Sequence, residues 1–229
     1  MTSKSSSTIR PRVAAIVLCG GKSSRMGEDK ANLQLGKRTM LEHVCGTLLT
    51  VVEQVVIVTS PEQPVDLTDH RVRVVVDDIP GEGPLGGFLT GLRSLVDGRA
   101  ESPSAIWLSA CDTPLIPASV IGKTCDQLQV AQADVVALSH EGRINPLIAA
   151  YHIQVLSAVE KAFDNGERSM MRVLSRLNYE AVDSGDFVED SRLLMNINHP
   201  DDLAEARQLL DTISSKERQY RSPGCGERN

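Results

Sequence analysis

The chain has 229 residues, of which 41% are hydrophobic and 24% are charged, a composition typical of a soluble globular domain with a sizeable core. Its net charge of −6 argues against a general nucleic-acid-binding protein, and its longest apolar run, the seven residues Val13–Cys19, is far shorter than the roughly twenty that span a membrane. The five cysteines form no C-x-x-C pair and the N-terminal segment has no apolar core, so we expect neither a disulfide framework, a zinc site nor a signal peptide, and we expect a cytoplasmic protein.

Strands and helices are expected to alternate along the chain. Residues 1–12 are expected to form a flexible, polar N-terminal arm, and the apolar run Val13–Cys19 is typical of a parallel strand buried on both faces. The later strands are predicted from short apolar runs over Gln54–Thr59, Val72–Val76, Ala105–Cys111, Asp134–Leu138, Leu147–Tyr151, Glu180–Asp183 and Leu193–Ile197. The helices are predicted after the Thr39–Glu42 capping box, around Phe88–Leu95, after Pro117, over His152–Phe163, over Met170–Leu177 and from Pro200 to Ile213.

This alternation predicts an α/β fold with three layers, in which a mostly parallel sheet carries helices on both faces. We expect a single domain over residues 13–213, followed by a polar, disordered tail over residues 214–229. Ligands of such sheets bind beyond the carboxyl ends of the strands. The loop after Val13–Cys19, the loop around Asp77 and the loop at Asp112 should therefore meet at one edge.

The stretch Leu18–Lys30, with the sequence LCGGKSSRMGEDK, follows the first strand and is rich in glycine and cations. The pair Gly20–Gly21 lets the backbone approach a ligand closely, and successive amide N–H groups in such a turn can face phosphate oxygens. Lys22, Arg25 and Lys30 add positive charges that suit a triphosphate. The alternative is an ordinary turn with solvated charges.

Two other phosphate-binding motifs do not fit. A Walker A loop needs a glycine where this chain has Ile16. The G-x-G-x-x-G pattern of Gly81, Gly83 and Gly86 follows the third predicted strand rather than the first and contains Pro84, which argues against a Rossmann dinucleotide-binding fold.

Asp112 is the strongest single candidate for a metal ligand. It follows an apolar strand and precedes Thr113 and Pro114, so its carboxylate should lie beside the phosphate loop. Mg²⁺ prefers one or two carboxylates together with substrate phosphates. The alternative is an aspartate that only stabilises the turn before Pro114.

These residues resemble the signature of the molybdopterin nucleotidyltransferases, in particular the molybdenum cofactor guanylyltransferases of the MobA type. That family carries the pattern L-A-G-G-x-S-x-R-M-G-x-D-K, which is matched by Leu18, Gly20, Gly21, Ser23, Arg25, Met26, Gly27, Asp29 and Lys30. Cys19 replaces the usual alanine. Two further segments, Cys111-Asp112-x-Pro114 and Gly83-Pro84-Leu85-x-Gly87, are also similar to family segments.

The resemblance implies roles for individual residues. Those implied to bind the nucleotide are Leu18, Cys19, Gly20, Gly21, Lys22, Ser23, Lys30, Asp77, Gly83, Pro84, Leu85 and Asp112. Those implied to take part in catalysis are Arg25, Lys30, Asp112, Asn196 and Asn198, with Asp112 as the ligand of Mg²⁺ or, alternatively, of Mn²⁺. Asp78 is the alternative to Asp77 as the nucleotide contact.

On the acceptor side, the segments Glu141-Gly142-Arg143-x-x-Pro146 and Gly166-Glu167-Arg168 resemble family segments. Arg143 and Arg168 are implied to contact phosphate or pterin groups, and the alternative is two surface arginines in turns. Asn196-Ile197-Asn198-x-Pro200 also resembles a family segment, while its residues alone suggest that Asn198 caps the last helix.

The reaction implied by the resemblance is transfer of GMP from GTP to the phosphate of molybdopterin, with release of pyrophosphate. A phosphate monoester has a second pKa of about 6, so it attacks as a dianion and needs no general base. The alternatives are a cytidylyltransferase acting on the same pterin, another small-molecule phosphate nucleotidyltransferase, or a non-catalytic nucleotide-binding adaptor. Transient contacts with proteins that deliver molybdopterin or accept the product are a further expectation, whereas contacts with nucleic acid or a membrane are not expected.

Overall fold

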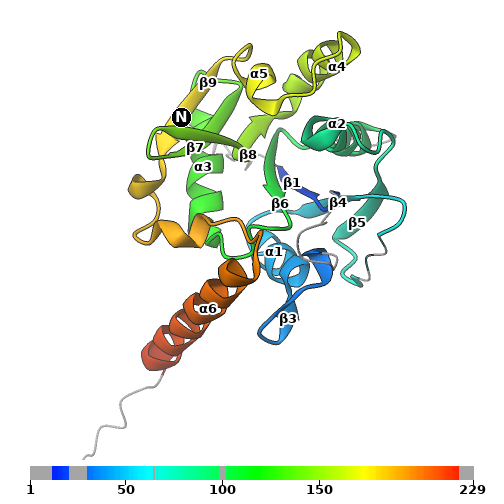
Figure 1. Cartoon of the computed structure of the whole chain (residues 1–229). Coiled ribbons are helices and arrows are strands. Elements are labelled where there is room, and N and C mark those ends of the chain that lie inside the picture. Colours follow the sequence, from blue (N-terminus) through cyan, green and yellow to red (C-terminus); the bar gives the residue numbers. More distant parts are fainter. Residues whose placement is uncertain (1–11, 21–29, 64, 66, 98–101, 222–229) are drawn as a thin grey trace, which may run out of the picture.

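A seven-stranded sheet forms the centre of the protein, in a computed structural model that describes residues 12–20, 30–63, 65, 67–97 and 102–221 (Figure 1). The strands lie in the order β5-β4-β1-β6-β8-β7-β9. Their bounds in chain order are β1 Val13–Leu18, β4 Gln54–Thr59, β5 Val72–Val76, β6 Ala105–Ala110, β7 Val135–His140, β8 Arg143–His152 and β9 Tyr179–Asp183. Only β8 runs against the others in this sheet, because it pairs antiparallel with both β6 and β7.

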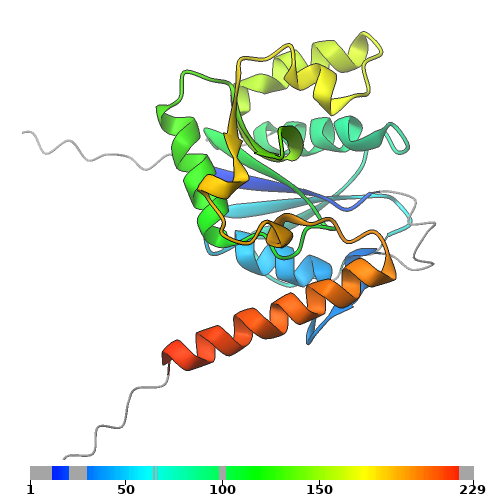
Figure 2. The same cartoon turned by 60° about the vertical axis from the view of Figure 1, so that its left-hand side comes forward.

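Helices cover both faces of the sheet, and Figure 2 shows α2 and α4 on one side of the strands and α1 on the other. One face carries α1 (Met40–Leu48) and α3 (Ala118–Val130), and the other carries α2 (Gly83–Val96), α4 (Leu156–Asp164) and α5 (Met170–Leu174). In β1, Ala15 and Val17 face one layer while Ala14 and Ile16 face the other, which is why the whole strand is apolar. The expected three-layer, mostly parallel α/β fold is confirmed.

A smaller apolar cluster attaches the last helix, α6 (Pro200–Arg221), to the rest of the molecule. It packs Leu203, Ala206 and Leu209 of α6 against Leu35 in the short hairpin of β2 (Gln34–Leu35) and β3 (Arg38–Thr39). Ile197, which is fully buried, belongs to the same cluster. The cluster thereby holds the segment before α6 close to the hairpin and to the preceding 3₁₀ turn η1 (Lys30–Asn32).

Several element boundaries differ from those predicted from the sequence. The helix expected around Phe88–Leu95 begins earlier, at Gly83, because Pro84 fits the first helical turn and Leu85 is already buried in the core. The last helix continues through residues 214–221, which were expected in a disordered tail, because Lys, Glu, Arg and Gln are good helix formers that need no apolar partner.

The stretch Leu193–Ile197 is not the predicted strand. Its first residues belong to the 3₁₀ turn η4 (Ser191–Leu194), in which Leu193 N–H donates to the Asp190 carbonyl at 3.1 Å. Its apolar side chains pack against two different clusters, which gives the stretch the alternating pattern of a strand. In the structure, however, this stretch pairs with none of the described strands. The two remaining 3₁₀ turns are η2 (Ile153–Val155) and η3 (Ser184–Asp186).

Strand β8 is longer than predicted and contains a bulge. It begins at Arg143 rather than at Leu147, and its pairing with β7 jumps from Asn145 opposite Leu138 to Ala149 opposite Ala137. Pro146, which has no N–H to donate, lies within this irregularity. None of the helices in the described part of the chain is long and apolar enough to cross a membrane.

Candidate active site

A cavity of about 220 Å³ opens at the sheet edge where β1 and β6 end. We call it the first cavity, and its lining residues are Leu18, Cys19, Gly20, Lys30, Pro84, Ala110, Cys111, Asp112, Thr113, Asn145, Leu147, Ile148 and Asn196. They come from the ends of β1 and β6, from η1, from the first turn of α2, from the start of β8 and from the segment before α6. The rule that ligands bind beyond the carboxyl ends of parallel strands therefore locates this cavity correctly.

Lys30, Asp112 and Asn196 line the first cavity although they are far apart in the sequence, and Asn198 contacts Lys30 beside them. The Lys30 Nζ atom lies 3.5 Å from Asp112 Oδ2 and donates a hydrogen bond to Asn198 Oδ1. The side chains of Lys30 and Asp112 are only 18% and 21% exposed, so water screens their charges weakly. A backbone hydrogen bond joins the segment before α6 to the loop after β6, because Ile197 N–H donates to the Asp112 carbonyl at 2.8 Å. This bond holds Asn198 close to Asp112.

The cap of α6 is formed by Asp202 and not by the side chain of Asn198. The Asp202 carboxylate accepts the N–H groups of Asn198 and His199, both at 2.8 Å. Asp202 thus stabilises the start of the helix from within its first turn. This arrangement leaves the Asn198 amide oxygen available to orient Lys30.

Burial raises the pKa of Asp112, and the charge and hydrogen bond of Lys30 act against that rise. A partly buried carboxylate beside one lysine suits a small hard cation, which would supply the positive charge that burial demands. The described residues contain no group of three or more His, Cys, Asp or Glu side chains that could hold a metal ion. The residues at Asp112 therefore fit Mg²⁺ of the kind that takes most of its ligands from substrate phosphates and water.

The other residues expected at the nucleotide divide into three groups. Leu18, Cys19, Gly20 and Pro84 line the first cavity. Gly83 and Leu85 lie beside Pro84 in the first turn of α2, where Gly83 has a φ of +75° and the Leu85 side chain is fully buried in the core. The remaining expected residues, Gly21, Lys22, Ser23 and Arg25, lie outside the described residues.

Asp77 lies at the end of β5 and faces α2. Its Oδ1 atom accepts hydrogen bonds from the Thr90 hydroxyl at 3.1 Å and from Ile79 N–H at 3.0 Å. Asp78 is exposed, and neither aspartate lines the first cavity. The contacts of Asp77 fix the start of the loop that leads into α2.

A second cavity, of about 280 Å³, adjoins the first. Its lining residues are Leu138, Ser139, His140, Arg143, Asn145, Ile148, Ser184, Ser191, Arg192, Leu194 and Met195. Asn145 and Ile148, in the bulged part of β8, line both cavities. Arg143, expected on the acceptor side, belongs to this second cavity.

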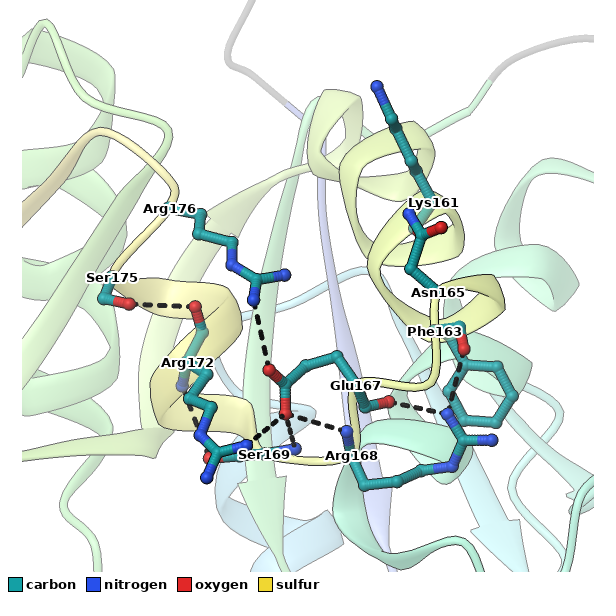
Figure 3. Close-up of polar contacts among 9 residues, drawn as sticks. All are labelled: Lys161, Phe163, Asn165, Glu167, Arg168, Ser169, Arg172, Ser175 and Arg176. Atoms are coloured by element: carbon teal, nitrogen blue, oxygen red, sulfur yellow. Dashed lines mark hydrogen bonds and ion pairs between the residues drawn. The ribbon is translucent and has the colours of Figure 1, made fainter.

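Arg168 lines neither cavity, and its guanidinium is occupied by other groups. It donates to the carboxylate of Glu82, just before α2. It also donates to the carbonyls of Phe163 at 2.9 Å and Glu167 at 2.7 Å, as Figure 3 shows. The guanidinium also lies 3.9 Å from the centre of the Phe163 ring. These contacts attach the loop after α4 to the start of α2, so Arg168 supports the wall that Pro84 contributes to the first cavity.

The carboxylate of the buried Glu167 faces the guanidinium groups of two arginines, Arg172 and Arg176 (Figure 3). Its Oε1 atom accepts hydrogen bonds from the backbone N–H groups of Arg168 and Ser169, both at 3.0 Å. The same carboxylate lies 3.6 Å from a guanidinium nitrogen of Arg172 and 3.3 Å from one of Arg176. The hydrogen bond from Ser169, that from Arg168 and the two arginine charges lower the pKa of Glu167, against a raising effect of burial. The Gly-Glu-Arg segment thus forms a rigid corner between α4 and α5.

Asn145 and the far wall of the second cavity were missed by reasoning from the sequence. Asn145 lies inside the segment Arg143-x-x-Pro146, where a polar residue next to a proline in a strand marks an irregular edge. His140, Ser184 and Arg192 lie on β7, η3 and η4, and no motif joins them in the sequence.

Comparison with known proteins identifies the family. A family model described as the MobA-like NTP transferase domain matches residues 15–182. Two relatives named probable molybdenum cofactor guanylyltransferase are each 32% identical to this chain. The one from Bacillus cytotoxicus aligns with 84% of this chain and 95% of its own length, and the one from Mycolicibacterium paratuberculosis with 86% and 96%. The crystal structure of molybdopterin-guanine dinucleotide biosynthesis protein A from Archaeoglobus fulgidus has the same fold, with a TM-score of 0.72 and 24% identity over 87% of this chain and 99% of that one. The chain therefore belongs to the family of MobA-like NTP transferases and is a nucleotidyltransferase.

Proposed function

We propose that this chain transfers the guanylyl group of GTP to the phosphate of molybdopterin, releasing pyrophosphate and forming the guanine dinucleotide of the cofactor. The relatives that align over most of the chain carry the name of that activity. The observation that carries the proposal is that Lys30, Asp112 and Asn196 line the first cavity together, with Asn198 hydrogen-bonded to Lys30. One cation, one carboxylate and neutral amides suit phosphoryl chemistry better than acyl or redox chemistry.

The chemistry requires little from the protein beyond binding and orientation. An oxygen of the acceptor phosphate attacks the α-phosphorus of GTP, a new P–O bond forms, and the bond to the β-phosphate breaks with pyrophosphate as the leaving group. The attacking phosphate has a second pKa of about 6, so at neutral pH it carries no proton that a base must remove. Among the described lining residues of the first cavity, Asp112 is the single carboxylate and no histidine is present, so the side chains near the nucleotide agree with a reaction that needs no base besides the metal ligand.

Lys30 is assigned to the triphosphate. Its Nζ atom is held by Asn198 and faces the cavity edge, where it would neutralise charge that develops on the leaving phosphate. Asp112 is assigned to Mg²⁺, with Mn²⁺ as the alternative hard cation. The bound ion would neutralise charge on the phosphate oxygens of GTP.

The second cavity is assigned to the acceptor. It shares Asn145 and Ile148 with the first cavity, so a ligand in it can place its phosphate near the nucleotide. Arg143 supplies a cation and Leu138, Ile148, Leu194 and Met195 supply apolar surface, a combination that suits a flat heterocycle with a phosphate. Arg168, which the resemblance also gave to the acceptor, is assigned the supporting role described above.

The proposal is tested by calorimetric titration of GTP, with and without Mg²⁺, into the wild type and the Asp112→Asn variant. We expect tighter GTP binding with Mg²⁺ for the wild type and no such gain for Asp112→Asn. Because burial disfavours the charged Asp112 carboxylate, the variant should melt at or above the wild-type temperature. Asp126→Asn, which removes an exposed carboxylate on α3, is the matched control and should keep the full Mg²⁺ effect. An undiminished Mg²⁺ effect in Asp112→Asn would contradict the assignment of the metal ligand.

A further inference from the structure

Asn145 occupies a special position between the two cavities. Only two residues of the described chain line both cavities, Asn145 and Ile148. Ile148 is 3% exposed and apolar, so Asn145 is the one side chain of this pair that can form hydrogen bonds. Asn145 is therefore the polar side chain that the two cavities share.

The orientation of the Asn145 amide is fixed by the chain itself. Its Oδ1 atom accepts a hydrogen bond from Leu147 N–H at 2.9 Å. This bond lies inside the bulge, where residues 146–148 have no partner residue on β7. The bond identifies Oδ1 as the acceptor end, and Nδ2 is therefore the end that carries two N–H donors.

These two donors have no use within the described part of the protein. No hydrogen bond from Asn145 Nδ2 to any described residue is present, although the opposite end of the same amide is well bonded. An amide group with one satisfied end and two unused donors, at the junction of two cavities, is suited to an anionic oxygen. The charged residues lining the two cavities are Lys30 and Asp112 in the first and Arg143 and Arg192 in the second, so cations outnumber carboxylates around the junction.

We propose that Asn145 binds the attacking phosphate of the acceptor through its Nδ2 donors and holds it in line with the α-phosphorus of GTP. This inference rests on the proposed function and names the group that joins its two substrates. A neutral donor orients an anionic oxygen while withdrawing less of its charge than an ion pair, so the oxygen remains a good nucleophile. The bulge in β8 then has a function, because it brings the amide to the sheet edge.

The two ends of the amide can be tested separately. Asn145→Asp keeps an oxygen for Leu147 N–H but replaces the donors with a negatively charged oxygen that repels phosphate. Asn145→Ala removes both ends. We expect Asn145→Asp to melt close to the wild-type temperature and to lower kcat/KM for molybdopterin by about 100-fold or more. Asn145→Ala should melt at a lower temperature but lose only about 10-fold in kcat/KM, because it adds no repulsion.

If Asn145 had only a structural role, the order of the two variants would be reversed, and Asn145→Ala would show the larger fall in kcat/KM. The measurements are the transfer from GTP to purified molybdopterin, the Kd of GTP with Mg²⁺, and the melting temperature. Asn165→Asp makes the same change at the exposed C-terminal cap of α4, where Nδ2 donates to the Lys161 carbonyl at 2.7 Å; this control should lower the melting temperature but retain wild-type transfer per folded molecule.

Three results would overturn the inference while leaving the proposed function standing: full transfer by Asn145→Asp, activity that falls only in step with melting temperature, or GTP affinity that weakens as much as kcat/KM for molybdopterin. A wild-type enzyme that forms no dinucleotide from GTP and molybdopterin would overturn the proposed function, and the assignment of Asn145 with it.

Discussion

Lys30 is the residue on which the site depends most. Its ion pair with Asp112 spans 3.5 Å, and because burial raises the pKa of Asp112, that carboxylate can take up a proton when the lysine is removed, which limits the loss of stability. Its hydrogen bond to Asn198 instead fixes where the ammonium group lies. A side chain held in place without a strong structural role is what a charge-neutralising group in phosphoryl transfer requires.

Lys30→Ala should therefore slow transfer far more than it lowers stability. We expect a fall in kcat of roughly 10²–10³, as for the loss of one group that stabilises transition-state charge. The melting temperature should fall by less than about 4 °C, which corresponds to about 1 kcal/mol in a chain of this size. Lys37→Ala, at an exposed position in the β2–β3 hairpin, should leave both quantities unchanged. A collapse of the melting temperature with normal activity per folded molecule would make Lys30 a structural residue.

The lowered pKa of Glu167 should make the free energy of unfolding depend on pH. Its pKa in the folded protein is lowered by the N–H groups of Ser169 and Arg168 and by the charges of Arg172 and Arg176. A carboxylate with a lowered folded pKa stabilises the protein fully above its unfolded pKa, about 4.3, and loses that effect as the pH falls through the folded value. Glu167→Gln keeps an oxygen for the two N–H groups but removes the charge.

We therefore expect Glu167→Gln to be less stable than the wild type at pH 7, and the difference to shrink below about pH 4. Urea unfolding of both proteins at a series of pH values measures this difference. A difference that stays constant across that range would show that the charge of Glu167 does not stabilise the fold.

At the scale of residues, the sequence predicted part of the site well. A carboxylate directly after a buried strand, Asp112, and a lysine at the end of a glycine loop, Lys30, were expected together and line the same cavity. Arg168 could not be assigned from its motif, because the sequence shows a cation but not the carboxylate and carbonyls that occupy it. Asn145 was missed for the related reason that its unused donors become visible only once Leu147 is seen to bind the other end of the amide.

Among the elements, α2 lies unusually close to β1. A Cβ atom added at Gly91 would lie 2.7 Å from Ile16 Cγ2, closer than carbon atoms can approach. Ile16 is fully buried in the middle of the sheet and has no room to move. The contact fixes the depth at which α2 packs, and through Pro84 it also fixes one wall of the first cavity.

Gly91→Ala should destabilise the protein by about 1–3 kcal/mol, the usual effect of overpacking a core. Gly122→Ala is the matched control on α3, because its added Cβ would meet only Val51 Cγ1 at 4.0 Å. That variant should be more stable than the wild type by about 0.5–1 kcal/mol, the gain expected for alanine over glycine inside a helix. Denaturant unfolding measures both, and equal effects of the two substitutions would contradict the close-packing argument.

The elements that the sequence predicted best are those with long apolar patterns, such as β1, β4 and α3. The hairpin of β2 and β3 was missed because each strand has two residues, which is too few to show a pattern. For α6 the start was correct, since Pro200 marks it, whereas the end was not, because the polar residues after Ile213 continue the helix without an apolar period.

At the scale of the whole molecule, the direction of the strands explains both cavities. Parallel strands bring the ends of β1 and β6 to one edge, and this gathers Gly20 and Asp112 from distant parts of the sequence. That part of the arrangement could be predicted from the alternation of strands and helices. The second cavity could not, because it depends on the reversed direction and the bulge of β8, which the pattern of apolar residues does not reveal.

The central claim is that these adjacent cavities join GTP to molybdopterin. The most direct measurement is a competition in which equal concentrations of GTP, CTP and ATP are supplied with Mg²⁺ and molybdopterin, and the products are identified by mass spectrometry. We predict the guanine dinucleotide as the main product, with one pyrophosphate released for each molecule formed. A cytosine or adenine dinucleotide as the main product, or pyrophosphate release without any dinucleotide, would contradict the account.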